Sequence, residues 1–388
     1  MPNLPPYLFI GGTSEPGGLH VHTADLAIAT AAAGHSVTIL CPSIDHFTPL
    51  FTGTPVRVHP IPPRAPDQSE WHYWRHHLAP HSSARAVFVR GMLGESTIMD
   101  LVAIRAATRR LYTLDHREPE MPGVTPRNLL RHGRAMRLLV HRAITVSPEI
   151  TRHAREKLRL PPRLLATCPN WPDPAFQPVT PDQRDAAKLA LGLSPSEYLI
   201  GYHGRLAPEK RIPALVEAFA TLRHPTPLRL LLIGDGWKRN EIQALVNARN
   251  LHASVTFTGW HPNPRDALAA LDLSVLPSLS EGFPLGLLEA MAMAKPCLAH
   301  PMPSTRLIIQ PHHNGHLADL STPQTFSAAL QNLLDLPPPQ RQTLGQNAAH
   351  TVTTTYARSQ RLPAVLQALD IHPPHPLPTQ PRHLVFAR

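Results

Sequence analysis

The stretch Ser280-Glu281-Gly282-Phe283-Pro284-Leu285-Gly286-Leu287-Leu288-Glu289-Ala290-Met291-Ala292 indicates the fold of this chain. It follows a mainly apolar run at residues 271–278, which is typical of a buried strand that ends in a loop. A strand, a glycine-bearing loop and a helix N-terminus in this order form an anion site, because the first N–H groups of a helix have no partner within the helix. A glutamate lies on each side of that site, and the hydroxyl groups of a sugar or a ribose can donate hydrogen bonds to such carboxylates.

Two cations lie in an earlier turn, Gly204-Arg205-Leu206-Ala207-Pro208-Glu209-Lys210, between a predicted strand and a predicted helix. Arginine offers a planar fork of donors and lysine a mobile point charge. A departing nucleoside diphosphate needs both its charge and its bridging oxygens stabilised. Taken alone, the turn could equally be a surface ion pair beside Glu209, but the glutamates downstream favour a diphosphate site.

Together these two stretches resemble the C-terminal half of the retaining glycosyltransferases of family 4, which have the GT-B fold. The resemblance implies an α/β chain of two Rossmann-like, doubly wound parallel-sheet domains that face a central cleft. It implies that Arg205 and Lys210 hold the diphosphate. It further implies that Glu281 contacts the donor sugar and that Glu289 accepts bonds from the ribose. Backbone groups of the same loops would complete the donor site, at Gly204, Gly282, Phe283, Leu285 and Gly286.

The chain departs from the family pattern at two places. Ala294 stands where the family usually has a glycine before Lys295-Pro296. The glutamate of a Gly-x-x-Glu segment is absent from residues 301–306. The specificity for the donor sugar therefore cannot be transferred from the resemblance.

The length and the order of the predicted elements indicate two domains. A chain of 388 residues exceeds one ordinary core, and strands alternate with helical patterns throughout. Strands are predicted at residues 7–12, 36–40, 56–61, 86–90, 110–114, 143–146, 198–202, 228–233, 254–258, 273–276 and 296–299. The clearest helical patterns cover residues 19–33, 129–141, 212–222, 239–249, 265–271, 285–293, 338–356 and 358–369.

A proline-rich segment at residues 168–178 marks the predicted join, because so much proline supports neither a helix nor a central strand. We therefore predict an acceptor-binding domain at 1–170 and a nucleotide-sugar-binding domain at 171–356. The resemblance implies that helices near 357–370 pack back on the first domain. Residues 371–388 are rich in proline and histidine and are predicted to be a disordered tail.

Three residues of the first half are candidates for the acceptor side. Gly17 and Gly18 precede a predicted helix and offer flexible backbone and free N–H groups as an acceptor or phosphate loop. His116 follows a predicted strand, at the edge where α/β proteins bind ligands. The resemblance gives His116 a catalytic role near the acceptor and the donor sugar, together with Glu281, Arg205 and Lys210. A plain loop histidine is the alternative, since the chain has 25 histidines.

The formal charge of +10 calls for an anionic partner. Arginines alternate with apolar residues from Arg127 to Arg142, so this segment could be a helix that lies on anionic lipid headgroups. A solvated basic helix is the alternative. Nucleic acid is not expected, because no recognition motif or aromatic interleaving accompanies the charge.

Other classes are excluded by composition. The three cysteines lie far apart, which argues against a disulfide framework or a zinc site and fits a cytoplasmic protein. His20 and His22 point to different faces of the predicted helix, so we expect no metal there. No secretory signal and no run long enough to span a bilayer is predicted.

The sequence thus predicts a metal-independent retaining hexosyltransferase without a cofactor. Its expected location is the cytoplasm, with the inner face of the cell membrane as a candidate peripheral location. It would move a hexosyl unit from a nucleotide-diphosphate sugar to a hydroxyl of a glycan, a lipid-linked sugar or a small acceptor. Three alternatives remain: a nucleotide-sugar epimerase or a phosphorylase with the same fold, or a catalytically inactive carbohydrate- or membrane-binding homologue. The base, the sugar, the acceptor and the linkage are not specified.

Overall fold

A computed structural model describes residues 4–11, 17–41, 48–90, 97–116, 125–260 and 264–375 of the chain. The chain divides into two compact units. The first unit contains the chain up to Asn170 together with the segment that begins at Arg358, and the second unit runs from Trp171 to Ala357. The predicted tail extends beyond residue 375, outside the described residues, and residues 371–375 form neither helix nor strand.

The first unit is built on a seven-stranded sheet of order β3-β2-β1-β4-β5-β6-β7, in which every pair of neighbours is parallel. Its strands are β1 (Tyr7–Ile10), β2 (Val37–Cys41), β3 (Arg57–Pro60), β4 (Arg85–Arg90), β5 (Arg110–Asp115), β6 (Arg142–Thr145) and β7 (Leu165–Thr167). Its helices are α1 (Gly18–Ala32), α2 (Glu70–Leu78), α3 (Ile98–Ala107), α4 (Pro126–Leu139), α5 (Pro148–Glu156) and α14 (Arg358–Ala368), with short 3₁₀ turns η1 (Thr48–Phe51), η2 (Ala79–His81) and η3 (Pro162–Leu164).

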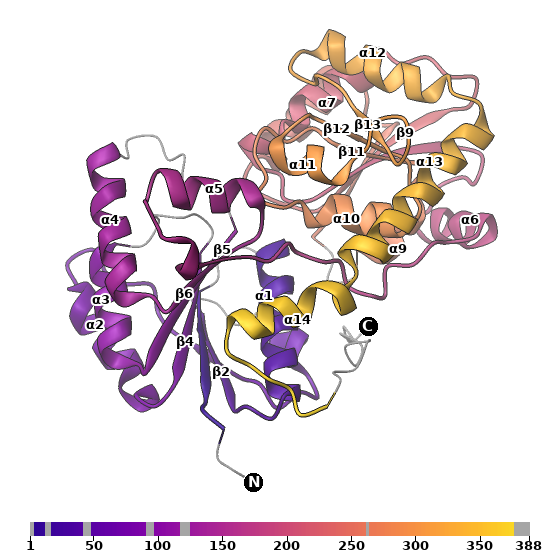
Figure 1. Cartoon of the computed structure of the whole chain (residues 1–388). Coiled ribbons are helices and arrows are strands. Elements are labelled where there is room, and N and C mark those ends of the chain that lie inside the picture. The colour runs from indigo at the N-terminus through magenta and orange to yellow at the C-terminus, as the bar shows by residue number, and fades with distance from the viewer. Residues whose placement is uncertain are drawn as a thin grey trace. The chain divides into compact units, whose positions relative to one another are not determined.

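Helices cover both faces of this sheet, with α1 and α14 on one side and α2, α3 and α4 on the other (Figure 1). Contacts to the sheet and to α1 attach the last helix and the residues that follow it. The Tyr7 hydroxyl donates to the Leu369 carbonyl, and the Arg358 guanidinium bonds the Asp25 carboxylate of α1 at 2.9 Å. The buried strand β1 is a continuous apolar run because both of its faces are covered.

The second unit repeats this plan with a six-stranded parallel sheet of order β10-β9-β8-β11-β12-β13. Its strands are β8 (Tyr198–His203), β9 (Leu228–Ile233), β10 (Val255–Gly259), β11 (Leu273–Leu276), β12 (Cys297–Ala299) and β13 (His316–Leu317). Its helices are α6 (Pro181–Ala190), α7 (Ile212–Phe219), α8 (Arg239–Ala248), α9 (Arg265–Ala269), α10 (Leu285–Ala292), α11 (Pro303–Ile308), α12 (Pro323–Leu334) and α13 (Pro338–Thr351), with the 3₁₀ turn η4 (Pro208–Lys210) and a π-helical turn (Val352–Tyr356).

The order of strands reverses between β1 and β4 in the first sheet and between β8 and β11 in the second. Ligands of doubly wound proteins bind outside the carboxyl ends of the strands at such a point. The apolar core of the second unit lies between the sheet and α7, α8 and α12, whose buried side chains include Leu215, Ile242 and Phe326. The predicted doubly wound architecture of two parallel-sheet domains is confirmed.

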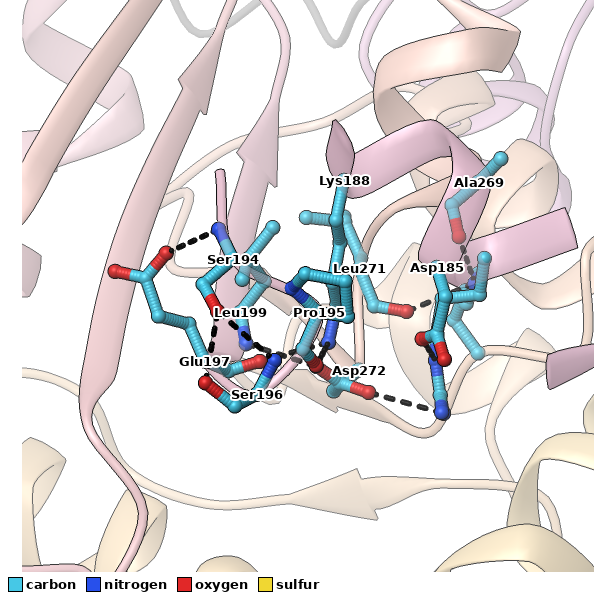
Figure 2. Close-up of polar contacts among 12 residues, drawn as sticks. Asp185, Lys188, Ser194, Pro195, Ser196, Glu197, Leu199, Ala269, Leu271 and Asp272 are labelled. Carbon is cyan, nitrogen blue, oxygen red and sulfur yellow. Dashed lines mark hydrogen bonds and ion pairs between the residues drawn. The ribbon is translucent and has the colours of Figure 1, made fainter. Parts of the chain in front are cut away.

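A buried hydrogen-bond network lies at the amino ends of the strands of this sheet, opposite the ends where ligands are expected (Figure 2). Lys188 of α6 donates to the Asp272 carboxylate at 2.8 Å and to the Glu197 carbonyl at 2.7 Å. The same carboxylate accepts the Leu199 N–H of β8 at 2.9 Å. Nearby, the buried Lys295 ammonium donates to two backbone carbonyls that follow α9 or lie in its last turn. These charged groups all have structural partners. The candidate site is therefore at the other edge of the sheet, where the strands have their carboxyl ends.

Candidate active site

The candidate site of the second unit lies where β8 and β11 end, at the reversal of strand order. The turn after β8 carries Arg205 and leads into η4 with Lys210, and the loop after β11 carries Glu281 and leads into α10. Because the two strands are neighbours and parallel, both loops leave the same edge of the sheet. The residues predicted from two distant stretches of sequence are therefore brought together.

Lys210 and Glu281 bind each other directly. The Lys210 ammonium, which is buried, donates to Glu281 Oε1 at 2.6 Å, and the Ser278 hydroxyl donates to the same oxygen at 2.7 Å. The backbone completes the junction, since the Leu279 N–H donates to the Glu209 carbonyl at 2.8 Å. Lys210 was predicted to face a diphosphate and Glu281 a sugar. In the structure the two side chains form an ion pair with each other.

Arg205 is held between an acid and an aromatic ring. Its guanidinium lies 3.2 Å from Glu209 Oε1 and 5.4 Å from the centre of the Trp237 ring. The backbone that delivers it is also fixed, because the Tyr202 hydroxyl donates to the Arg205 carbonyl at 2.9 Å. Gly204 has φ +151°, and a Cβ there would lie 2.7 Å from that hydroxyl, so only glycine fits before the arginine.

Trp237 is a residue of this site that the sequence reasoning missed. It follows the glycine-rich turn after β9 and is 63% exposed despite its size. A guanidinium over an indole ring is attracted by about 0.5–1 kcal/mol at an exposed position. Trp237 therefore limits the rotamers of Arg205. A large aromatic residue in a glycine-rich turn at the carboxyl end of a strand was the available signal.

Helix α10 approaches the end of β8 very closely. A Cβ at Gly286 would lie 2.8 Å from the His203 carbonyl, so a larger residue would push the helix away from the strand. The N-cap of α10 is Pro284, which has no N–H to donate. The first turn of the helix is closed by the Leu288 N–H, which donates to the Pro284 carbonyl at 3.3 Å. The N–H groups of Leu285 and Gly286 belong to the first turn and have no partner within the helix. Phe283, also predicted for this cradle, is buried against Tyr356 at 5.4 Å between rings.

Glu289 lies deeper in α10 and is buried. It is not in the first turn of the helix, so helix capping does not explain its position. Its Oε2 lies 3.1 Å from His203 Nδ1, at ion-pairing distance but without hydrogen-bond alignment. His203 ends β8 and is the second residue that the sequence reasoning missed, because only the fold places it beside Glu289.

The acceptor-side candidates lie in the first unit, at the carboxyl ends of its strands. Gly17 is the N-cap of α1 and Gly18 its first residue. Gly17 has φ 179°, which any residue adopts, and a Cβ there would meet nothing within 4 Å. Gly17 therefore adopts a conformation that does not require glycine, and its role in an acceptor or phosphate loop stays a prediction. The N-cap makes no side-chain hydrogen bond and the first turn contains no acid, so the N–H groups of α1 suit an anion or a hydroxyl.

His116 follows β5 and is buried, with its ring edge-on to His22 of α1 at 5.2 Å. Burial, and secondarily the neighbouring His22, lowers the pKa of His116 well below its usual value. Burial also lowers the pKa of His22 to about 4. Both rings are therefore neutral at neutral pH. Among the described residues no cluster of three or more His, Cys, Asp or Glu is arranged to hold a metal ion.

A buried ion pair supports the strand that delivers His116. Arg90 ends β4 and its Nε donates to Asp115 Oδ1 of β5 at 2.7 Å, and both side chains are buried. Arg90 Nη1 also lies 3.1 Å from His132 Nε2 of α4. The His116 N–H donates to the Arg90 carbonyl at 3.2 Å. The role of Arg90 was not predicted, although a charged residue at the end of an apolar strand was visible in the sequence.

Two family models match the chain, one on each unit. The model of the glycosyl transferases group 1 matches residues 183–351, and the model named Glycosyltransferase Family 4 matches residues 16–176. Each model covers less than half of the chain, and the two together cover most of it.

Among curated proteins, the N-acetyl-alpha-D-glucosaminyl L-malate synthase of Bacillus anthracis is 33% identical over 156 residues, which are 39% of this chain and 41% of that protein. The UDP-Gal:alpha-D-GlcNAc-diphosphoundecaprenol alpha-1,3-galactosyltransferase of Escherichia coli is 27% identical over 185 residues, 46% of this chain and 48% of that protein. The matches thus span less than half the length of these curated relatives. Among solved structures, Anabaena HepE in complex with UDP and glucose has a TM-score of 0.79 and 18% identity, over 95% of this chain and 100% of that chain. At that identity the likeness concerns the fold alone.

Proposed function

The chain belongs to the family 4 glycosyltransferases of the GT-B fold, and on this premise we propose that it is a retaining hexosyltransferase. It moves a hexosyl unit from a nucleotide-diphosphate sugar to an acceptor hydroxyl. The observation that carries the proposal is the convergence of two cations and two carboxylates at the strand reversal of the second sheet. That site offers Arg205 and Lys210 to a diphosphate and Glu289 to a ribose.

The proposed chemistry is a front-face transfer in which the departing diphosphate helps to remove the acceptor proton. Arg205 and Lys210 stabilise the negative charge that grows on the leaving diphosphate. Such electrostatic stabilisation is usually the largest single contribution of an active site to lowering the barrier. Glu281 contacts the donor sugar and His116 the acceptor side. Neutral His116 can accept or donate a hydrogen bond to an acceptor hydroxyl without adding a charge on the acceptor side. Because two side-chain cations serve the diphosphate, we propose that transfer needs no divalent metal.

The relatives support the donor and acceptor classes of this proposal. HepE was solved with UDP and glucose, and the Escherichia coli relative is named for a UDP-galactose donor and a lipid-linked diphosphate acceptor. The Bacillus anthracis relative is named for a small acceptor, L-malate. We accordingly propose a nucleotide-sugar donor and a glycan, lipid-linked or small hydroxyl acceptor.

We further propose that α4 rests on anionic lipid at the inner face of the cell membrane. Its buried residues are His132, Gly133 and Met136, and its opposite face exposes Arg127, Arg131, Arg134 and Arg137. Leu138 on that side is 85% exposed. The expectation of one basic helix up to Arg142 is wrong in its last part, because α4 ends at Leu139 and Arg142 begins β6. Among the described residues no helix is long and apolar enough to cross a membrane.

The test begins with thermal stabilisation of the full chain by a panel of nucleoside diphosphates, UDP first. A ligand at 100 times its Kd adds about 2.7 kcal/mol to the free energy of unfolding. The stabilising nucleotide is then supplied as its sugar conjugates with and without EDTA, and transfer and hydrolysis are followed. Product with the anomeric configuration of the donor supports the proposal. Inversion of the anomeric configuration would contradict the retaining mechanism. An epimerised donor would indicate an epimerase, and phosphate-dependent cleavage would indicate a phosphorylase.

Loss of either cation should slow this reaction strongly. We expect Arg205→Ala and Lys210→Ala each to raise the barrier by about 2–4 kcal/mol, since both face charge that grows as the bond breaks. The matched control is Arg249→Ala. It removes an exposed arginine of the second unit that pairs with Glu217 and does not belong to the candidate site. Transfer rates of the three variants under saturating donor decide the point. A wild-type rate in Arg205→Ala or Lys210→Ala would contradict the assignment.

A further inference from the structure

A cavity of about 550 Å³ lies in the first unit, away from the residues discussed so far. Its walls are one face of β2 and β3, the end of α2, η2, and the residues at the amino ends of β1 and β4. It reaches Tyr7 at the start of β1, Ser36 before β2 and Ser83 before β4, so it opens along the sheet toward the amino ends of the strands. The acceptor-side candidates follow the carboxyl ends, and the cavity is a separate feature of this unit.

The cavity exists because no helix among the described residues covers this part of the sheet face. Helix α2 packs over β4, where its Trp74 ring lies 6.2 Å from the Phe88 ring. The only element between β2 and β3 in the described residues is the short turn η1, and it contacts α1 on the opposite face. The face of the edge strand β3 is therefore left without an apolar layer.

Groups that can carry positive charge line this space where apolar residues would normally fill it. Register partners place Thr38 and Arg57 on one face, and Leu40 and His59 on the same face two residues further. Across the cavity lie His76 and His77 of α2 and His81 of η2. No acidic residue stands among the described residues that line it. Leu40, Pro60 and Ile61 form an apolar side.

The imidazoles of the cavity repel each other when protonated. Burial and the charge of His76 lower the pKa of His77, whose ring also packs on Tyr73 at 4.7 Å. Burial and the charge of His59 lower the pKa of His81. An anion among these rings would offset the repulsion, so anion binding and proton uptake are coupled here.

We propose that this cavity binds the phosphomonoester of a small metabolite. Donors from three elements surround the space, which suits the three oxygens of a phosphate better than the two of a carboxylate. The volume lies within the range of small-molecule sites, whereas inorganic phosphate would leave most of it empty. The organic part of the ligand would contact Leu40, Pro60 and Ile61. The site is independent of the glycosyl-transfer proposal, since none of its residues belongs to that machinery.

Calorimetric titration of the full chain tests this with glycerol 3-phosphate, glucose 6-phosphate, inorganic phosphate and citrate at pH 6, 7 and 8. We expect an organic phosphate to bind with a Kd below about 1 mM, and affinity to fall at least tenfold from pH 6 to pH 8. The binding enthalpy should change with the ionisation enthalpy of the buffer, which reports proton uptake. The same binding should persist in the Arg205→Ala/Lys210→Ala double variant, which removes the donor-site cations.

Variants locate the site. Arg57→Gln and the pair His76→Gln/His81→Gln should each weaken binding at least tenfold. The controls Arg75→Gln and His72→Gln change exposed residues of α2 that do not line the cavity and should bind as the wild type does. Unfolding midpoints of all variants exclude loss of the fold. Four results would overturn the proposal. These are no binding of the organic phosphates at pH 6, unchanged binding in the cavity variants, loss of binding in the Arg205→Ala/Lys210→Ala double variant, and tighter binding of citrate than of the organic phosphates.

Discussion

The direct bond between Lys210 and Glu281 has a consequence for ligand binding. A diphosphate that reaches Lys210 must share its ammonium with a carboxylate that already lies 2.6 Å away. A sugar hydroxyl on the same ligand could donate to that carboxylate, so the intact donor satisfies both groups at once. The bare diphosphate offers only phosphate oxygens and leaves Glu281 facing negative charge. The pair therefore favours the intact donor over the product that leaves.

Substitution of the two glutamates should separate their roles. We expect Glu281→Gln to bind the bare nucleoside diphosphate about tenfold more tightly, because Lys210 loses its counter-ion, while transfer slows through loss of a sugar contact. Glu289→Gln should weaken the bare diphosphate, because the ribose loses a charged acceptor. Calorimetric titration of both variants measures this. Weaker binding in Glu281→Gln with unchanged binding in Glu289→Gln would mean that the two roles are reversed.

Among elements, α10 shows how a departure from the family pattern affects the local backbone. The helix ends at Ala292, Met293 is its C-cap, and Ala294 then adopts φ +57°. A left-handed conformation costs a residue with a Cβ about 1–2 kcal/mol, and glycine is the usual solution after a helix. Ala294 therefore carries strain at the end of α10 next to Lys295, at the amino ends of the strands and opposite the candidate site.

Relief of that strain should stabilise the second unit. We expect Ala294→Gly to raise the free energy of unfolding by about 0.5–1 kcal/mol, after allowance for the greater backbone entropy of glycine. Ala292→Gly is the control, since the same change inside the helix should lower it by about 1 kcal/mol. Urea unfolding followed by tryptophan fluorescence compares the midpoints. A midpoint for Ala294→Gly at or below that of the wild type would show that the left-handed residue is not strained.

Helix α4 permits a direct test of the membrane proposal. We expect the chain to sediment with vesicles that contain anionic lipid, and less so as salt is raised. Each basic residue near such a surface contributes about 1 kcal/mol, so reversal of Arg131, Arg134 and Arg137 to Glu should weaken binding by at least about 100-fold. Reversal of Arg75, Arg109 and Arg163, which are exposed on other parts of the first unit, makes the same change of net charge. Equal loss in both triple variants would mean that total charge, not α4, governs binding.

The elements of the sheets were largely predictable from the sequence, and the contacts of the site were not. Buried parallel strands such as β9 and β11 are mainly apolar, and both were predicted at their observed bounds. The edge strands β7 and β13 were missed, because strands of three and two residues carry no pattern. Candidates after strand ends could be identified from motifs. The partners of Lys210 and Glu289 depend on loop conformation and on how closely α10 approaches β8.

At the scale of the whole molecule, the two units differ in how they bury titratable groups. The first unit buries neutral histidines near its carboxyl edge, and burial lowers the pKa of both His22 and His132 to about 4. The Arg90 guanidinium beside His132 acts in the same direction. The second unit buries Lys295, and burial lowers its pKa to about 7. The unfolded chain thus binds more protons than the first unit between about pH 4 and 6.5, and more than the second unit above pH 7.

Acidification should therefore weaken the first unit before the second. A histidine with a folded pKa of about 4 and an unfolded pKa of about 6.5 removes about 2 kcal/mol of stability between neutral pH and pH 5. Two such residues predict a loss of about 4 kcal/mol in the first unit. Lys295 is half protonated at pH 7 and fully protonated at pH 5, so it removes only about 0.4 kcal/mol from the second unit. Hydrogen exchange at pH 7 and pH 5, corrected for intrinsic rates, should show lost protection in β4, β5 and α4 while β8, β9 and β11 stay protected.

His132→Gln keeps an acceptor for Arg90 without a titratable ring, and it should recover about half of the stability that the first unit loses at pH 5. If both units lose protection equally, or if His132→Gln is as acid-sensitive as the wild type, the buried histidines do not set the acid stability of this protein.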